Sequence, residues 1–230
     1  MTIVYEDNHL IIVNKDASEI VQGDKTGDTP LSEKVKDYLK TRYNKPGDVF
    51  LGVTHRLDRP VSGLVIFAKT SKALSRMNEM LRNNDVKKHY WAITCNQPHP
   101  DEALLTDYLE KNETLNKSFV VSEQSKNAKK ASLSYRLLAA SDRYFLIEVE
   151  LFTGRHHQIR VQLAHIGCPI KGDLKYSAPT SNKDASISLH AHKVSFVHPV
   201  KKELLTLTAP PPDDPLWNFF LSQNIENKEL

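Results

Sequence analysis

The segment HRLDRPVSGL, at residues 55–64, is the feature that most constrains this chain. It places the carboxylate of Asp58 between Arg56 and Arg59, directly before an apolar run that predicts a strand over residues 64–69. Neighbouring guanidinium groups favour the ionised form of a carboxylate. A proline and a glycine in the segment restrict and then release the backbone, so that a turn here can aim its side chains outward. Two interpretations stay open at this point: a carboxylate held for catalysis, or an ordinary surface turn with an ion pair.

Three later blocks carry charged and aromatic residues in a definite order. They read KHYWA at residues 88–92, TGRHHQIR at 153–160, and GCPIKGD at 167–173 followed by Tyr176. Together with the first segment, they resemble the pattern of the RluA-type RNA pseudouridine synthases. Members of that family carry His-Arg-Leu-Asp, then Lys-x-Tyr-x-Ala, then Thr-Gly-Arg-x-His-Gln-Ile-Arg. Several ordered blocks are more specific than any one of them.

The resemblance runs from about residue 4 to about residue 210 and implies a fold and a reaction. The implied fold is α+β, with a mixed, mostly antiparallel sheet, flanking helices and a central cleft. We expect a single catalytic domain over residues 1–230, without a separate N-terminal RNA-binding module. The implied reaction detaches uracil from ribose at nitrogen 1, turns the base within the site and rejoins it through carbon 5. Nothing is consumed, so neither a cofactor nor a metal is expected.

The resemblance also implies three catalytic residues: Asp58, Tyr90 and Arg155. Asp58 is expected to act at the ribose or at the uracil during bond cleavage, and the sequence does not choose between these routes. Arg155 is expected to pair with Asp58 and keep it ionised. Tyr90 is expected to pack against the uracil ring and can take part in removing the carbon 5 proton.

Three further residues are expected at the substrate site. Arg56 is expected to help extrude the target base from its stack, because unstacking costs a few kcal/mol that a guanidinium filling the gap can offset. His55 and Arg160 are expected to organise this substrate-binding site rather than to react. The chain's lysines are dispersed, and those beside the matched blocks are the better candidates for phosphate contacts.

Three residues depart from the family pattern. Asp16 and Ser18 stand where proline and glycine are common after an Asn-Lys pair, so we expect a loop that is more flexible or differently shaped. Val61 replaces a threonine that is often seen before Ser-Gly, which removes one supporting hydrogen bond.

Composition indicates a globular protein and argues against membrane and secreted classes. The chain has 230 residues, 26% of them charged and 40% hydrophobic, which is a globular balance. Its net charge of +3 is compatible with a local basic surface. No apolar run approaches the ~20 residues of a membrane span, and the N-terminus has no basic region followed by an apolar one. We therefore expect a cytoplasmic protein that does not bind a membrane. The resemblance implies that its partner is ribosomal or transfer RNA and not DNA, and we expect a monomer.

Alternative chemistries find weaker support. Cys95 and Cys168 lack the spacing of a disulfide framework or a zinc site. No HExxH motif occurs, and the adjacent His156 and His157 would point to different sides of a helix. An RNA-binding chaperone of the same fold and a sugar-processing hydrolase remain as the two alternatives. The chaperone would tolerate loss of Asp58, and the hydrolase would release a product instead of isomerising RNA.

Apolar periodicity predicts the following elements. Strands are expected over residues 3–5, 10–14, 64–69 and 89–94, a hairpin over 131–138 and 144–152, and a last pair over 186–197 and 203–208. Residues 96–127 are expected to be loops or short strands. Helices are expected with caps at Thr29, Ser71, Thr153 and Asp214, and the third would hold Arg155 in its first turn.

Overall fold

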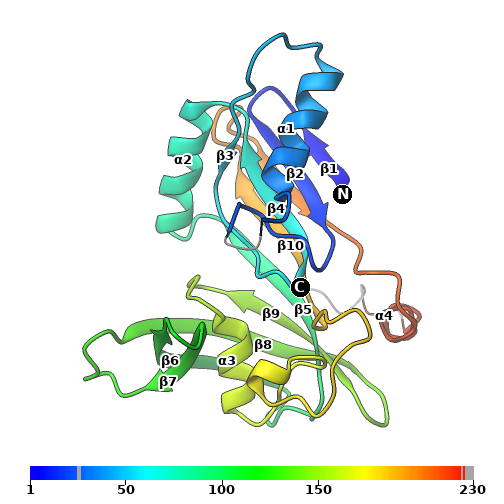
Figure 1. Cartoon of the computed structure of the whole chain (residues 1–230). Coiled ribbons are helices and arrows are strands. Elements are labelled where there is room, and N and C mark those ends of the chain that lie inside the picture. The colour runs from blue at the N-terminus through cyan, green and yellow to red at the C-terminus, as the bar shows by residue number, and fades with distance from the viewer. Residues whose placement is uncertain (25–26, 224, 226–230) are drawn as a thin grey trace. The chain divides into compact units, whose positions relative to one another are not determined.

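A computed structural model of the chain describes residues 1–24, 27–223 and 225. These residues form two compact units (Figure 1). Unit 1 comprises the described residues of Met1–Val86 and of Ala191–Pro210, and unit 2 comprises Lys87–His190 and the described residues from Pro211 onward. The described part contains no helix that is long and apolar enough to cross a membrane.

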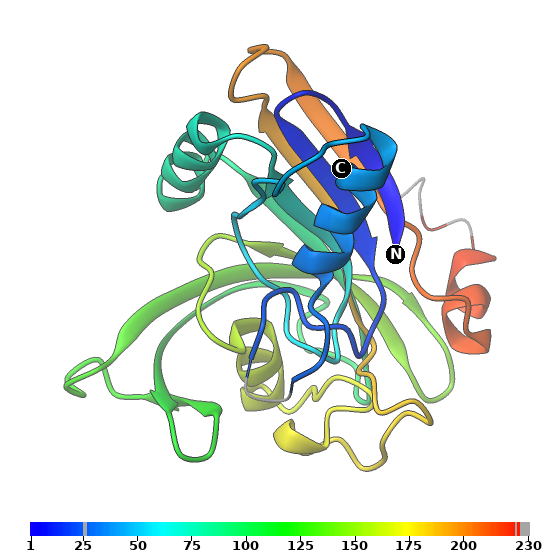
Figure 2. The ribbon, with the colours of Figure 1, turned by 45° about the horizontal axis from the view of Figure 1, so that its top comes forward.

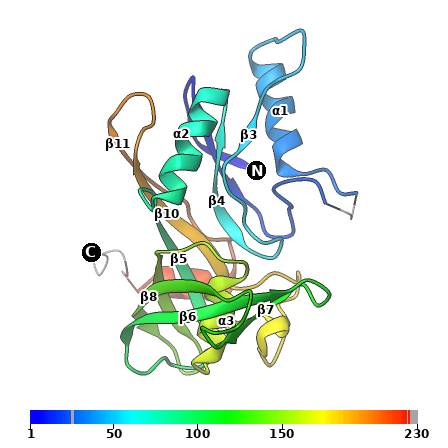
Figure 3. The same ribbon diagram turned by 90° about the vertical axis from the view of Figure 1, so that its left-hand side faces the viewer.

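Unit 1 is built on strands in the order β1-β2-β4-β10, with β11 paired to β10 and β3 paired to β4. Every residue of β4 is buried, so both faces of this strand are covered. Helix α2 lies beside β4 (Figure 3). Its Ala73 and Met77 share a buried cluster with Leu64 and Ile66 of that strand. The bounds are β1 Thr2–Glu6, β2 Leu10–Lys15, β3 Gly52–Val53, β4 Ser62–Ala68, β10 Leu189–Val197, β11 Leu204–Thr208, α1 Leu31–Arg42 and α2 Ser71–Arg82.

Unit 2 is built on antiparallel strands in the order β5-β9-β8-β6-β7, which Figure 2 shows as long curved ribbons. Helix α4 packs Trp217 and Phe220 against Trp91 on one face of β5. Helix α3 packs Val161 against Ala131, on the face that the strand register also assigns to Tyr90. The bounds are β5 Lys87–Thr94, β6 Glu102–Asn112, β7 Lys117–Val121, β8 Lys129–Ala140, β9 Phe145–Leu151, α3 Gln158–His165, the short 3₁₀ helix η1 Leu174–Tyr176, and α4 Pro215–Leu221.

These elements confirm most of the predicted strands and show two omissions, the two-residue β3 and the long β6. Residues 96–127, expected to be loops or short strands, include β6, an 11-residue strand that pairs with both β7 and β8. Its burial alternates weakly, and Leu109 is its one fully buried position among the described residues. A strand that buries so little apolar surface leaves a faint periodic signal.

The helix starts differ from the prediction in three of four cases. Helix α1 has Pro30 rather than Thr29 at its N-cap, and no side chain caps it. The N-cap of α2 is Thr70 rather than Ser71, and its hydroxyl accepts a hydrogen bond from the Ala73 amide. Helix α3 begins at Gln158, five residues after the expected cap. Only the cap of α4 is as predicted: the Asp214 carboxylate accepts hydrogen bonds from the first amides of that helix.

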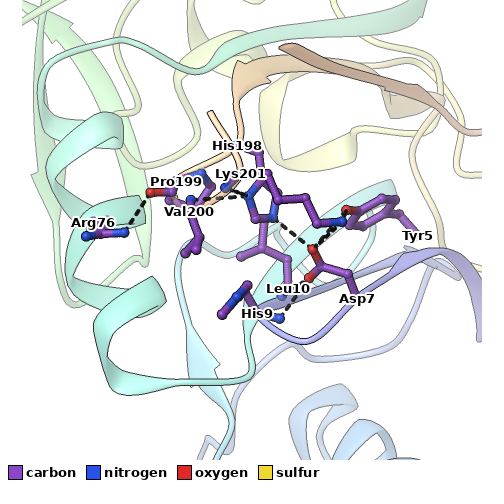
Figure 4. Close-up of polar contacts among 9 residues, drawn as sticks. All are labelled: Tyr5, Asp7, His9, Leu10, Arg76, His198, Pro199, Val200 and Lys201. Atoms are coloured by element: carbon purple, nitrogen blue, oxygen red, sulfur yellow. Dashed lines mark hydrogen bonds and ion pairs between the residues drawn. The ribbon is translucent and has the colours of Figure 1, made fainter. Parts of the chain in front are cut away.

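A buried polar cluster ties two turns of unit 1 together (Figure 4). The Nδ1 atom of His198 accepts hydrogen bonds from the amides of Val200 and Lys201, at 3.2 and 2.9 Å. Nε2 therefore carries the proton of the neutral ring, and it lies 3.1 Å from Oδ2 of Asp7. Burial alone would raise the pKa of Asp7, but hydrogen bonds from the amides of Leu10 and His9 outweigh it and hold that pKa well below its usual range. The cluster fixes the β1–β2 turn against the β10–β11 turn.

Candidate active site

The segment that carries Asp58 is anchored to β4 at its start. The hydroxyl of Thr54 donates a hydrogen bond to the carbonyl of Ile66 at 2.7 Å. Nε2 of His55 accepts one from the Ile66 amide at 3.1 Å. After the buried Leu57, the Val61 amide closes a turn by donating to the Asp58 carbonyl at 3.0 Å. His55 thus has the contacts of an organising residue, and the turn around Asp58 starts from a fixed position.

A buried lysine supports this turn, and no chemical pattern in the sequence singled it out. Lys15, at the end of β2, is 0% exposed. Its ammonium donates hydrogen bonds to the carbonyls of Asp16, Glu19 and Arg59, at 2.9, 2.8 and 3.2 Å. Burial lowers the pKa of Lys15 to about 8, against the pull of the Glu19 and Asp58 carboxylates, which raise it. Lys15 therefore joins the 15–19 loop to the Asp58–Arg59 turn and places a positive charge near Asp58.

The two backbone positions beside Lys15 adopt unusual conformations. Ser18 has a φ of +72°, in the left-handed region that glycine favours, and its amide donates to the Arg59 carbonyl at 2.9 Å. Ser18, which stands where glycine is common in the family pattern, therefore adopts the backbone conformation that glycine favours. Gly63, paired with Lys15 across the strands, has a φ of +116°, and a Cβ on it would lie 2.4 Å from the carbonyl oxygen of Ala191. No other residue fits at position 63 without moving β10.

The two arginines that flank Asp58 have different surroundings. Arg59 donates a hydrogen bond from Nη2 to Oδ2 of Asp28 at 2.7 Å. Arg56 is exposed, and within the described residues its guanidinium makes no hydrogen bond or ion pair. Arg56 is therefore the arginine of the pair that is available to a ligand.

In unit 2, Tyr90 lies in the middle of β5, opposite Val149 of β9. It is 8% exposed, so most of its side chain is buried. Lys88 precedes it by two residues on the same strand and is partly buried. Because side chains of a strand alternate between its faces, Lys88 and Tyr90 point to the same side of β5.

Arg155 lies in a loop before α3 rather than in its first turn, which corrects the prediction. The loop is held by Gln158, whose Oε1 accepts hydrogen bonds from the Thr153 hydroxyl at 2.7 Å and the Arg155 amide at 3.0 Å. Thr153 is thus bonded to a side chain instead of capping a helix. The guanidinium of Arg155 donates from Nε to the Lys130 carbonyl at 2.9 Å, and the residue is exposed.

The adjacent histidines do not point to different sides of a helix. The rings of His156 and His157 stack with centroids 3.8 Å apart, because His157 is the N-cap of α3 in a left-handed conformation, with a φ of +55°. Nδ1 of His157 lies 2.9 Å from the Tyr176 hydroxyl. Burial, followed by the positive charge of Arg160, lowers the pKa of His157 to about 2. This ring is therefore neutral over the physiological pH range.

Arg160 is buried in the same network and faces a carboxylate. Its Nε and Nη2 atoms donate to the two oxygens of Asp173 at 2.7 and 2.8 Å. A bidentate pair of this kind fixes geometry as well as charge. Arg160 consequently fixes the turn that precedes Tyr176, and its expected role at the substrate site stays a prediction.

The described residues contain no group of three or more His, Cys, Asp or Glu side chains that could hold a metal ion. Chemically, the predicted site residues supply one carboxylate, one phenol and exposed guanidinium groups. Such groups can perform nucleophilic or acid–base steps on an anionic substrate.

Comparisons with known proteins place the chain in a family. The model of the family described as RNA pseudouridylate synthase matches residues 9–165. The tRNA pseudouridine synthase C of Vibrio cholerae is 32% identical over 97% of this chain and 95% of its own length. An uncharacterized RNA pseudouridine synthase of Synechocystis is 31% identical over 92% of the chain.

Solved structures agree with the fold. Human RNA pseudouridylate synthase domain containing 4 superposes with a TM-score of 0.78 at 24% identity, covering 96% of this chain and 92% of its own. The α+β pseudouridine synthase fold that the resemblance implied is thereby confirmed. The chain spans about two thirds of the length of some curated relatives: 66% of the Synechocystis protein and 65% of the ribosomal large subunit pseudouridine synthase C of Vibrio cholerae. From the family match and these identities, the chain belongs to the RNA pseudouridylate synthase family.

Proposed function

We propose that this protein isomerises specific uridines in structured RNA to pseudouridine, with Asp58 as a catalytic residue. The observation that carries the proposal is the family match over residues 9–165, a span that contains Asp58, Tyr90 and Arg155. Relatives are named for action on transfer RNA and on the large ribosomal subunit, so either RNA is a candidate substrate. A cytoplasmic monomer that needs no cofactor stays a prediction.

The reaction balances within one nucleotide. The bond between ribose carbon 1′ and uracil nitrogen 1 breaks, and a bond between carbon 1′ and carbon 5 forms. The hydrogen on carbon 5 leaves as a proton, and nitrogen 1 ends with a proton, so that no electrons are lost or gained. Asp58 acts as the nucleophile or base in the first step, at the ribose or at the uracil. The Asp58 carboxylate raises the pKa of Lys15, so the Lys15 ammonium places a positive charge near the proposed catalytic residue.

Two further residues have roles in this proposal. Tyr90 packs against the uracil and takes part in removing the proton from carbon 5. Arg56 fills the space that the extruded base leaves, a role that its exposed guanidinium supports. The pairing of Arg155 with Asp58 that the resemblance implies stays a prediction.

The test is release of tritium from carbon 5 of labelled uridine in total RNA that lacks this modification. We expect wild type to release tritium and Asp58→Asn to release none, while RNA binding and folding are retained. Asp37→Asn is the matched control, because Asp37 is an exposed carboxylate on α1. RNA binding without release by the wild type would support the chaperone alternative. Release of sugar from an oligosaccharide would support the hydrolase.

A further inference from the structure

Lys88 is a lysine withdrawn from water, and the part of the chain that the structure describes places no counter-charge beside it. It is partly buried at the start of β5, and within the described residues its ammonium makes no hydrogen bond or ion pair. Burial lowers the pKa of Lys88, and no charged neighbour offsets this effect. Removing an ammonium from water has a free-energy cost that a partner of opposite charge normally offsets. The position therefore lacks an anion that would complete it.

The surroundings of Lys88 place this ammonium among the predicted site residues of unit 2. It shares a face of β5 with Tyr90, about 7 Å along the strand. A Cβ built on Gly154 would lie 3.9 Å from Nζ of Lys88, so the ammonium lies over the loop that carries Arg155. The φ of Gly154 is outside the left-handed region, so backbone strain does not require a glycine there. The missing side chain instead leaves the ammonium uncovered on that side.

We propose that Lys88 binds a phosphate of the RNA backbone next to the uridine that contacts Tyr90. The inference rests on the proposed function, because that function supplies the anion: a substrate RNA carries one phosphate for each nucleotide. Lysine binds phosphate as a point charge through several rotatable donors. The phosphate restores the solvation that Lys88 loses on folding and anchors the strand one nucleotide away from the reacting base.

Two lysines in sequence provide a matched pair of variants for kinetics and binding. Lys87→Gln and Lys88→Gln remove the same charge, but Lys87 is exposed and points to the opposite face of β5. We expect Lys88→Gln to raise KM for unmodified transfer-RNA and ribosomal-RNA transcripts about tenfold to hundredfold with little change in kcat. It should also reduce the slope of log binding constant against log salt by about 0.7–0.9. Lys87→Gln should do neither, and Lys88→Arg should restore most of the binding.

A direct measurement separates this inference from the enzyme activity. Labelled lysine side chains report the pKa of Lys88 by NMR, with its signal assigned from the Lys88→Arg variant. We expect a ten-residue oligouridine to raise that pKa toward its ordinary value. The same oligomer with uncharged methylphosphonate linkages should not raise it.

The outcomes distinguish the two proposals. A pKa shift with oligouridine but no tritium release from any RNA would leave the phosphate site standing and remove the proposed reaction. Equal pKa shifts with both oligomers, or none with either, would overturn the phosphate site even if tritium is released. A loss of kcat with unchanged KM in both Lys88→Gln and Lys88→Arg would also overturn it, since that pattern indicates proton transfer.

Discussion

Two lysines on strands of different units, Lys15 and Lys88, are both withdrawn from water and have opposite surroundings. Lys15 is fully buried, and three backbone carbonyls accept hydrogen bonds from its ammonium. Lys88 is partly buried, and within the described residues its ammonium has no acceptor. Burial lowers both pKa values. This difference shows that the burial of a lysine does not by itself indicate whether the residue is structural or binds a ligand. A lysine whose donors are all used holds the fold, whereas one whose donors are left over is available to a ligand.

The largest expected effect is on stability and comes from Lys15. Lys15→Met removes the ammonium that donates to the carbonyls of Asp16, Glu19 and Arg59, and the Arg59 carbonyl keeps the hydrogen bond from the Ser18 amide. The variant should destabilise unit 1 by about 2–4 kcal/mol. Lys88→Met should not destabilise unit 2, because no hydrogen bond is lost and an ammonium is no longer withdrawn from water. Hydrogen exchange of peptides from β2, β4 and β5 measures both. Equal losses of stability in the two variants would contradict the difference drawn between Lys15 and Lys88.

A second, smaller effect is expected for His157, a buried base of unit 2 that has a polar partner in the Tyr176 hydroxyl, whereas Lys88 has none among the described residues. His157 has a folded pKa of about 2, below its unfolded value of about 6.5, so the unfolded state binds more protons between these values. The stability that neutral His157 contributes is complete above pH 6.5 and is lost as the pH falls. The loss at pH 5 should be roughly 2 kcal/mol.

His157→Asn is the variant for this test, since asparagine tolerates the left-handed backbone and does not titrate. Its stability should depend less on pH between 6.5 and 5 than that of the wild type. Trp91 and Trp217, both in unit 2, report the unfolding by fluorescence. Identical pH dependence in the two proteins would contradict the burial of a neutral His157.

The smallest effect concerns the loop that Lys15 holds. Ser18 has a φ of +72°, which costs a residue with a Cβ more than it costs glycine. Ser18→Gly should therefore stabilise unit 1 by about 0.5–1 kcal/mol, whereas Ser18→Ala should not. Urea unfolding followed by hydrogen exchange of β2 peptides compares the three proteins. A destabilised glycine variant would mean that the serine hydroxyl contributes more than the strain costs.

Strong local patterns in the sequence predicted most of the fold. The alternation of Phe145, Ile147, Val149 and Leu151 predicted β9, and the Asp214–Pro215 pair predicted the start of α4. Strand β6 escaped prediction because it buries little apolar surface. The predicted caps of α1, α2 and α3 were also wrong. Several neighbouring residues could cap each helix, and contacts distant in sequence decide between them, such as that of Gln158 with the Ser132 carbonyl.

The sequence by itself determined which family this chain belongs to and which side chains are candidates for its chemistry. Ordered motifs can be recognised without knowing which residues lie next to them in space. Only the tertiary structure decided which charges are satisfied. In the sequence, Lys15 and Lys88 look like equally ordinary lysines. In the structure, the ammonium of Lys15 donates hydrogen bonds to three carbonyls, whereas that of Lys88 has no acceptor within the described residues. The physical reason is that the free energy of a buried charge depends on the acceptors around it. Those acceptors come from residues far apart in the chain, such as Arg59 for Lys15.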